Sequence, residues 1–310
     1  MGFARVGLKS YNIPMRKYVF WILFLAIAVV LGVLLFPSKK AQMANTPVVL
    51  TSGYVPYTIT QQLAGGNVSV QMLLPPGAEP HAFEPTPGAL LTLKQAAAFI
   101  YVSDELEPWA ADLAKAAGVQ TRLVQLASTV PAGADPHIWM TFDNAKILAA
   151  QIAQVLEDIA PAHKEIFEKN LAKFNREMDQ LSSAFQTALA RCRSRRVVHV
   201  GHLAFKNLAD AYHLQLAALS GTSHEGEHSA KKLAQLIKQI KESNVSAIFT
   251  EDTLSPRLAQ TVAQETGAQI LPLYPVEHIS KEDFNHNVTY AELMHRNLES
   301  LKRGLQCPAP

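Results

Sequence analysis

The stretch PAHKEIFEKNLAKFNREMDQLSSAFQTALARC, residues 161–192, decides the architecture that we expect. Pro161 suits the first turn of a helix, and no further Pro and no Gly interrupts the stretch. A helix of about 30 residues needs a packing partner along most of its length. The apolar stripe that would meet this partner consists of Ile166, Leu171, Phe174, Met178, Leu181 and Phe185.

Strand-like and helical segments alternate on both sides of this predicted helix. The strands are short β-branched or apolar runs such as VVLTS at 48–52 and VSAIFTE at 245–251. Such alternation predicts parallel sheets that are covered by helices. We therefore predict an α/β protein of two lobes, each a mostly parallel sheet with flanking helices, joined by one long rigid helix.

This interpretation divides the chain into four segments. Residues 1–44 hold a cytoplasmic stub, a membrane or signal segment and a linker. Residues 45–158 are the predicted N-terminal α/β lobe, 159–191 the linking helix, and 192–310 the C-terminal α/β lobe.

Residues 18–36 indicate export. They read YVFWILFLAIAVVLGVLLF, without charge or proline, and this length is enough for a helix to cross a bilayer. Because the heavier basic flank precedes them, we expect a cytoplasmic N-terminus and an uncleaved transmembrane anchor. That flank consists of Arg5, Lys9, Arg16 and Lys17.

A cleaved signal peptide is the alternative for this segment. Signal peptides have a shorter apolar region, of about 7–15 residues, and end in a small-x-small site. In AQMA at 41–44, Gln42 occupies a position where a small residue is required, and no cysteine follows that could carry a lipid. We favour the anchor, and either alternative places residues 45–310 outside the cytoplasm.

The net charge bears on the class of partner, and the cysteine content bears on disulfide formation. A net charge of +2 with no dense basic tract argues against a nucleic-acid partner. The two cysteines, Cys192 and Cys307, would form a disulfide in an oxidising compartment, although two unrelated thiols remain the alternative. We expect a monomer.

Three histidines lie at strand-to-helix junctions or in loops: His81 in AEPHAFEP, His137 in ADPHIWM and His202 in VGHLAF. Open α/β sheets place ligand sites at the carboxyl ends of their strands. Glu79 and Asp135 each precede one histidine by two residues, with a proline between, and could hold its second ring nitrogen. Any one of these histidines alone would be read as an exposed loop residue, but three in equivalent settings favour a metal site, and three imidazoles suit zinc.

The chain resembles the extracytoplasmic solute-binding proteins of ABC importers for zinc or manganese. The resemblance rests on LLPPGAEPHAFEPTP, DPHIWMTFDNA, GHLAFKNLADAYHL and weaker similarity over nearly all of the exported part. It implies two α/β lobes with the metal in the cleft, and His81, His137 and His202 as ligands. It also implies an ABC permease and its cytoplasmic ATPase as partners.

The sequence departs from this family at the fourth ligand. Many members carry an Asp where LPLYPVEH places Tyr274, so water, Glu251, Glu277 or Tyr274 could complete the site. Loss of that carboxylate would leave a nitrogen-rich site, which favours Zn2+ over Mn2+.

The remaining histidines are interpreted as structural. A histidine-rich loop is absent, and we read His224 and His228 as part of a solvated loop, with an accessory metal site as the alternative. His199 should be a satisfied core histidine. We expect surface or helix positions for His163, His213, His278, His286 and His295.

Two other function classes remain open. Three histidines with an open fourth position also suit a zinc hydrolase, with Glu251 or Glu79 as base. No nucleophile motif supports an enzyme, so we expect no catalytic residues. A surface adhesin on the same scaffold is the other alternative.

Overall fold

The computed structural model describes residues 46–118, 121–131, 133, 135–219, 221, 230–243, 245–251 and 256–308. Within the chain, Pro47–Pro310 forms one compact unit. The predicted membrane segment, 18–36, lies outside the described residues, as do His224 and His228. In the part that is described, no helix is both long and apolar enough to span a membrane.

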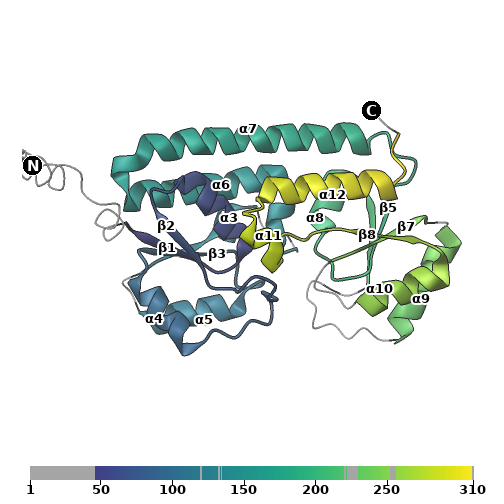
Figure 1. The fold of residues 1–310 in the computed structure, drawn as a ribbon, viewed down its shortest axis with the longest axis horizontal. Coiled ribbons are helices and arrows are strands. Elements are labelled where there is room, and N and C mark those ends of the chain that lie inside the picture. Colours follow the sequence, from purple (N-terminus) through teal and green to yellow (C-terminus); the bar gives the residue numbers. More distant parts are fainter. Residues whose placement is uncertain are drawn as a thin grey trace, which may run out of the picture. The chain divides into compact units, whose positions relative to one another are not determined.

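The first lobe is built on a four-stranded parallel sheet with the order β2-β1-β3-β4. Its middle strands bury every or nearly every side chain, as sheets covered on both faces do. Helices α4 and α5 cover one face, and α3 lies on the other (Figure 1). The elements are β1 Val48–Thr51, α3 Tyr54–Ala64, β2 Ser69–Met72, α4 Pro87–Gln95, β3 Ala98–Tyr101, α5 Pro108–Ala117 and β4 Arg122–Gln125.

The second lobe repeats this plan with the order β6-β5-β7-β8, again all parallel. Helices α9 and α10 cover its outer face (Figure 1). The two lobes that we predicted are therefore present. The elements are β5 Arg196–His199, α8 Lys206–Ala211, β6 Gln215–Ala218, α9 Ala230–Ser243, β7 Ala247–Thr250, α10 Pro256–Thr266 and β8 Gln269–Pro272.

Three long helices run beside the two sheets: α6 Phe142–Ile159, α7 Lys164–Leu189 and α12 Tyr290–Gly304. Figure 1 shows α7 extending along both lobes, with α6 and α12 against it. Short 3-10 turns precede α6, at Ile138–Met140, and α7, at Pro161–His163. The packing partners that a helix of this length requires are thus supplied by α6, α12 and α3.

The predicted stripe of α7 is wrong at its first position. Ile166 is 40% exposed, whereas Phe167 is fully buried. Phe167 precedes Phe174 by two helical turns, and Ile166 is rotated away from that line by about 100°. The buried residues of α7 are Phe167, Phe174, Met178, Leu181, Phe185 and Leu189.

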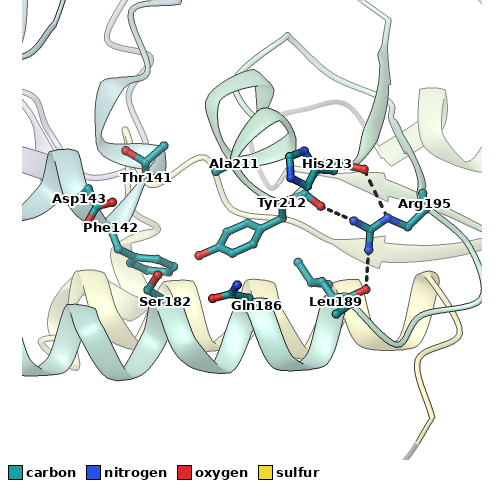
Figure 2. A pocket seen from close by; sticks show the side chains of 11 residues that line it. Thr141, Phe142, Asp143, Ser182, Gln186, Leu189, Arg195, Ala211, Tyr212 and His213 are labelled. Carbon is teal, nitrogen blue, oxygen red and sulfur yellow. Dashed lines mark hydrogen bonds between the residues drawn. The ribbon is translucent and has the colours of Figure 1, made fainter.

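A pocket of about 330 Å³ lies beside α7 (Figure 2). Ser182 and Gln186 line it from α7, and Tyr212 lines it from the end of α8. Next to it, Arg195 donates hydrogen bonds to the carbonyl oxygens of Leu189, Tyr212 and His213. This guanidinium ties the C-terminal end of α7 to the second lobe, and none of the three predicted site histidines lines the pocket.

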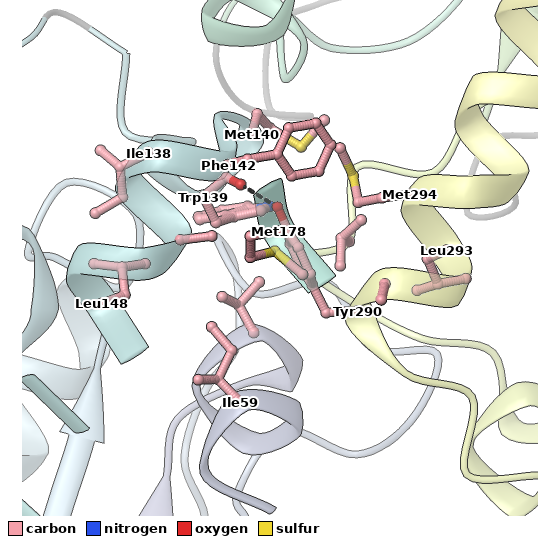
Figure 3. Close-up of a cluster of buried hydrophobic side chains, with 14 of the residues drawn as sticks. Ile59, Ile138, Trp139, Met140, Phe142, Leu148, Met178, Tyr290, Leu293 and Met294 are labelled. Atoms are coloured by element: carbon pink, nitrogen blue, oxygen red, sulfur yellow. Dashed lines mark hydrogen bonds between the residues drawn. The ribbon is translucent and has the colours of Figure 1, made fainter. Parts of the chain in front are cut away.

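The core extends continuously beneath α7 and α12. Figure 3 shows Trp139, Met178, Tyr290 and Met294 meeting in this cluster. The hydroxyl of the fully buried Tyr290 donates a 2.6 Å hydrogen bond to Trp139 O. The same cluster includes Val49, near the start of the described chain, and Leu305, near its end.

The C-terminal region also packs on the first lobe, which the sequence did not predict. Tyr290 N donates to Thr58 Oγ1 at 3.3 Å, and the Tyr54 hydroxyl donates to Val288 O. The short helix α11, Lys281–Asn285, lies next to α3, where Phe284 contacts Tyr57. The chain thus returns to its first lobe before it ends.

The predicted disulfide is present between Cys192 and Cys307. It joins the turn after α7 to the residues that follow α12, across a sequence separation of 115. The two long helices are therefore linked covalently at one end.

Candidate metal centre

His81 lies on the proline-rich loop between β2 and α4. The carbonyl of Pro80 accepts a 2.8 Å hydrogen bond from Trp109 Nε1, and Phe83 packs edge-on against the same indole. The His81 amide donates to Glu79 Oε1 at 3.1 Å. These contacts, together with the prolines, fix a loop that has no regular secondary structure.

His137 stands between β4 and α6 and is fully buried. Asp135 Oδ1 lies 2.7 Å from its Nδ1 and accepts a 3.1 Å bond from its amide. From the second lobe, Asn207 donates to Asp135 Oδ2 and to His137 O, at 3.3 and 3.0 Å. The turn that carries His137 is therefore held by both lobes.

His202 and Glu251 follow the neighbouring parallel strands β5 and β7, so they meet at one edge of the sheet. Glu251 Oε1 lies 3.1 Å from His202 Nδ1 and accepts from its amide at 3.3 Å. The ring of His199 contacts His202 O at 3.0 Å through Nδ1. His199 is fully buried, in agreement with its predicted core position.

Glu277 enters the same space from the loop that follows β8. Trp139 Nε1 donates to Pro275 O at 2.8 Å and so anchors this loop to the turn after His137. Val276 adopts a φ of 65°, a conformation uncommon for a β-branched residue. The side chain of Glu277 is 1% exposed.

Ligand-type atoms of His81, His137, His202 and Glu277 lie within 4.8 Å of one another. Glu277 Oε2 is 3.5 Å from His81 Nε2 and 3.3 Å from His137 Nε2. Glu277 Oε1 is 3.1 Å from His202 Nε2, which is 3.2 Å from His137 Nε2. Zinc bound tetrahedrally at about 2.0–2.1 Å separates its ligand atoms by roughly 3.3–3.4 Å, so these spacings fit such an ion.

The orientation of two imidazoles also suits a cation. Asp135 and Glu251 face the Nδ1 atoms of His137 and His202, which favours the tautomer with a proton on Nδ1. The Nε2 lone pairs then point at each other across 3.2 Å. Without a proton or a metal ion between them, this arrangement is repulsive.

The charges of the site shift its pKa values in opposite directions. Burial lowers the pKa of His202, but Glu277 and the bond to Glu251 outweigh burial and raise it to about 11. Burial also lowers the pKa of His137, but the hydrogen bonds to Asp135 and Glu277 outweigh burial, and the pKa is raised. Burial raises the pKa of Glu277, but the facing imidazoles hold it well below its usual range.

The structure corrects three expectations about this region. A carboxylate is not lost from the site, because Glu277 supplies one. Tyr274 is directed elsewhere: its amide donates to Asn297 Oδ1 at 2.7 Å, and Arg296 lies over its ring. His278 is buried, at 4% exposure, rather than on the surface, because it follows Glu277 into the interior.

Sequence reasoning named Glu277 only as one of four alternatives for the fourth position. The signal available was an acidic residue shortly after a strand of the second lobe. Its position depends on the turn at Pro275 and Val276, which no local pattern predicts. Glu251, another alternative, contacts Nδ1 of His202, whereas Nε2 of that ring faces Glu277 and His137.

Comparison with known families gives one match over most of the chain. The family ZnuA, described as "Zinc-uptake complex component A periplasmic", matches residues 49–304. Among curated relatives, the zinc-binding lipoprotein AdcA of Streptococcus pneumoniae is 30% identical over an alignment of 295 residues that covers 88% of this chain. The chain spans only 58% of the length of AdcA.

Two further relatives are named for zinc as well. The high-affinity zinc uptake system protein ZnuA of Bacillus subtilis is 29% identical over 278 residues, covering 83% of this chain and 87% of that protein. The Zn(II)-bound ZnuA-like domain of S. pneumoniae AdcA has a TM-score of 0.75 at 30% identity, over 84% of this chain and 99% of the domain.

A laminin-binding protein, Lmb of Streptococcus agalactiae, is similarly close. Its structure gives a TM-score of 0.77 at 32% identity, over 84% of this chain and 99% of that chain. It is described as a bifunctional protein with adhesin and metal-transporting activity.

Proposed function

This chain belongs to the ZnuA family of periplasmic zinc-uptake components, and from that premise we propose that it binds Zn2+ outside the cytoplasm for delivery to an ABC permease. The observation that carries the proposal is the convergence of His81, His137, His202 and Glu277 on one buried point. We assign these four side chains as the ligands of the transported ion.

The donor set favours zinc over manganese. Three imidazole nitrogens and one carboxylate suit Zn2+, whereas Mn2+ prefers oxygen ligands. Asp135 and Glu251 would hold the two buried rings with Nε2 free to coordinate, as carboxylates behind metal-binding histidines commonly do. These two side chains therefore prepare the site before the ion arrives.

The same donor set argues for binding rather than hydrolysis. A catalytic zinc keeps one coordination position open for water, whereas Glu277 would take the fourth position here. The metal is thus the cargo of the protein and not a reagent.

Delivery requires partners that supply the channel and the energy. We propose an ABC permease with its cytoplasmic ATPase, and attachment to the membrane through residues 18–36, with cleavage and secretion as the alternative. The protein would act as a monomer, because each chain contains all four ligands.

Titration of the purified full chain with zinc by calorimetry tests this proposal. We expect about one tight equivalent, and at least a 10- to 100-fold loss of affinity in each of H81A, H137A, H202A and E277Q. H286A is the matched control, because His286 is exposed and its ring contacts the carbonyl of Glu282 instead of any of the four side chains. Wild-type affinity in all four site variants would overturn the assignment.

The likeness to Lmb supports adhesion as a second candidate function. Binding of the purified chain to immobilised laminin, with and without zinc, tests it. Saturable binding that survives in H202A would assign adhesion to a surface separate from the metal centre, and no binding would remove this candidate.

A further inference from the structure

Asn207 of the second lobe is bonded to the turn of the first lobe that carries His137. Its side-chain nitrogen, Nδ2, donates to Asp135 O at 3.4 Å and to His137 O at 3.0 Å. A side-chain amide has two N–H donors, so both are directed at this one turn. The backbone amide of Asn207 donates to Asp135 Oδ2 at 3.3 Å. One residue thus makes three hydrogen bonds to Asp135 and His137.

The turn needs such partners because residues 135–137 belong to no helix or strand. Buried carbonyl oxygens in an irregular segment must accept hydrogen bonds from other parts of the chain. From the first lobe, Asn144 donates to Ile138 O at 2.9 Å, and Met140 N donates to His137 O at 3.2 Å. The second lobe supplies the bonds of Asn207 to the two carbonyls before Ile138.

Asn207 is itself held firmly in the second lobe. It lies in α8, five residues after His202, and its neighbours Phe205 and Leu208 are each 1% exposed. The ring of Phe205 packs edge-on against His199, with 4.8 Å between centroids, and His199 Nδ1 contacts His202 O at 3.0 Å. The segment that positions His202 therefore also positions Asn207.

The place of His137 in the metal centre depends on this turn. Its Nδ1 contacts Asp135 Oδ1 at 2.7 Å, and its Nε2 lies 3.2 Å from His202 Nε2. Metal–ligand distances are fixed to within about 0.2 Å. A shift of the turn by a few tenths of an ångström would therefore move this nitrogen out of range of an ion held by the other ligands.

We propose that Asn207 is a positioning residue through which the second lobe holds the first-lobe ligand His137 in place for zinc. The inference rests on the proposed function, since it concerns the affinity of that same site. Contact between the lobes thus contributes to zinc affinity through the backbone of one turn, in addition to the ligands that each lobe provides.

Substitution of Asn207 by alanine tests the proposal. N207A removes both side-chain bonds and keeps the backbone amide. We expect the zinc affinity of the full chain to fall roughly 10-fold, because one or two hydrogen bonds of ordinary net strength correspond to about this factor. Competition with a chromophoric zinc chelator measures it.

N170A is the matched control for a lost asparagine bond. Asn170 is also partly buried, and it donates to a backbone carbonyl of another element, Leu63 O, at 2.9 Å. Neither residue belongs to the metal centre or to the turn of His137. N170A should therefore keep the zinc affinity of the wild type.

Double variants show whether Asn207 acts through His137. The loss caused by N207A should persist in H81A and in H202A, because His137 is still present in both. In H137A it should have little further effect, since the ring that Asn207 positions is missing. A general loosening of the structure would instead weaken all three backgrounds alike.

Circular dichroism and urea unfolding of the metal-free chain check that each variant is folded, and N207S replaces N207A if the latter does not fold. The inference is overturned if folded N207A binds zinc as the wild type does, if N170A loses as much affinity, or if the loss is as large in H137A as in H81A. Wild-type affinity in H81A, H137A and H202A themselves would contradict the proposed function instead.

Discussion

At the scale of single residues, Gly201 shows how little room surrounds the metal centre. A Cβ atom at this position would lie 2.2 Å from Glu251 Oε1 and 2.5 Å from His199 Cε1. Both side chains contact His202, so a larger residue must displace one of its two supports.

We therefore predict that G201A lowers zinc affinity by roughly 10- to 100-fold, the usual effect of disturbing the groups behind a metal ligand. Calorimetry on the purified chain measures it. G88A is the matched control, since a Cβ at Gly88 meets only Thr86 Oγ1 at an ordinary 3.5 Å. Equal affinities in both variants would show that Glu251 is not required for the position of His202.

Glu107 makes stability depend on pH. Burial raises the pKa of this carboxyl from 4.5 to about 7, although it accepts a hydrogen bond from Val102 N. The unfolded chain releases this proton at lower pH than the folded protein does. Stability should therefore fall as the pH rises from about 4.5 to 7, by roughly 3 kcal/mol from this group.

Urea unfolding of the metal-free protein at pH 5 and pH 8 checks this expectation. In E107Q the side chain cannot ionise, so its loss of stability over this interval should be smaller by about that amount. A pH dependence shared by the wild type and E107Q would contradict the prediction.

At the scale of elements, the parallel sheets explain why residues distant in sequence meet. His202 and Glu251 follow adjacent strands whose carboxyl ends share one edge. The apolar periodicity predicted the long helix α7. It was wrong at one position, where Phe167 and not the neighbouring Ile166 is buried. The loop after β8 has no such pattern, and it carries both Glu277 and His278.

The disulfide between Cys192 and Cys307 fastens α7 to α12, and it closes a loop of 115 residues. Constraint of the unfolded chain by such a loop stabilises a protein by about 2–5 kcal/mol. We predict a loss of this size in C192S/C307S, measured by urea denaturation against the oxidised wild type. Zinc affinity should change little, because neither cysteine belongs to the site, and a large loss of affinity would contradict this independence.

At the scale of the whole molecule, the metal centre joins the two lobes. Asn207 donates to Asp135 and His137, and Trp139 donates to Pro275 across the same boundary. The C-terminal helices return to the first lobe through Tyr290 and its bond to Thr58. Binding of an ion at this junction must therefore stabilise the molecule as a unit.

We predict that zinc at a free concentration about 1,000-fold above its dissociation constant adds about 4 kcal/mol of stability. With the usual unfolding entropy per residue, a protein of this length converts that stabilisation into a rise of roughly 6–7 °C in Tm. Differential scanning calorimetry in chelator and in buffered zinc measures it. H202A should show little of this rise, and an equal rise in H202A would place the stabilising ion elsewhere.

The sequence by itself determined the alternation of strands and helices, the long helix and the three histidines at loop positions. These features depend on neighbouring residues, on the periods of helix and strand, and on prolines whose effect is local. A histidine at the end of a parallel strand could thus be recognised without knowledge of the fold.

Only the tertiary structure decided that Glu277 lies beside the three histidines, that His278 is buried and that the C-terminal helices return to the first lobe. Each depends on where a loop passes after an irregular turn, and that path is set by contacts with distant residues such as Trp139. Those contacts form only when the core has assembled, and they produce no periodic pattern in the sequence.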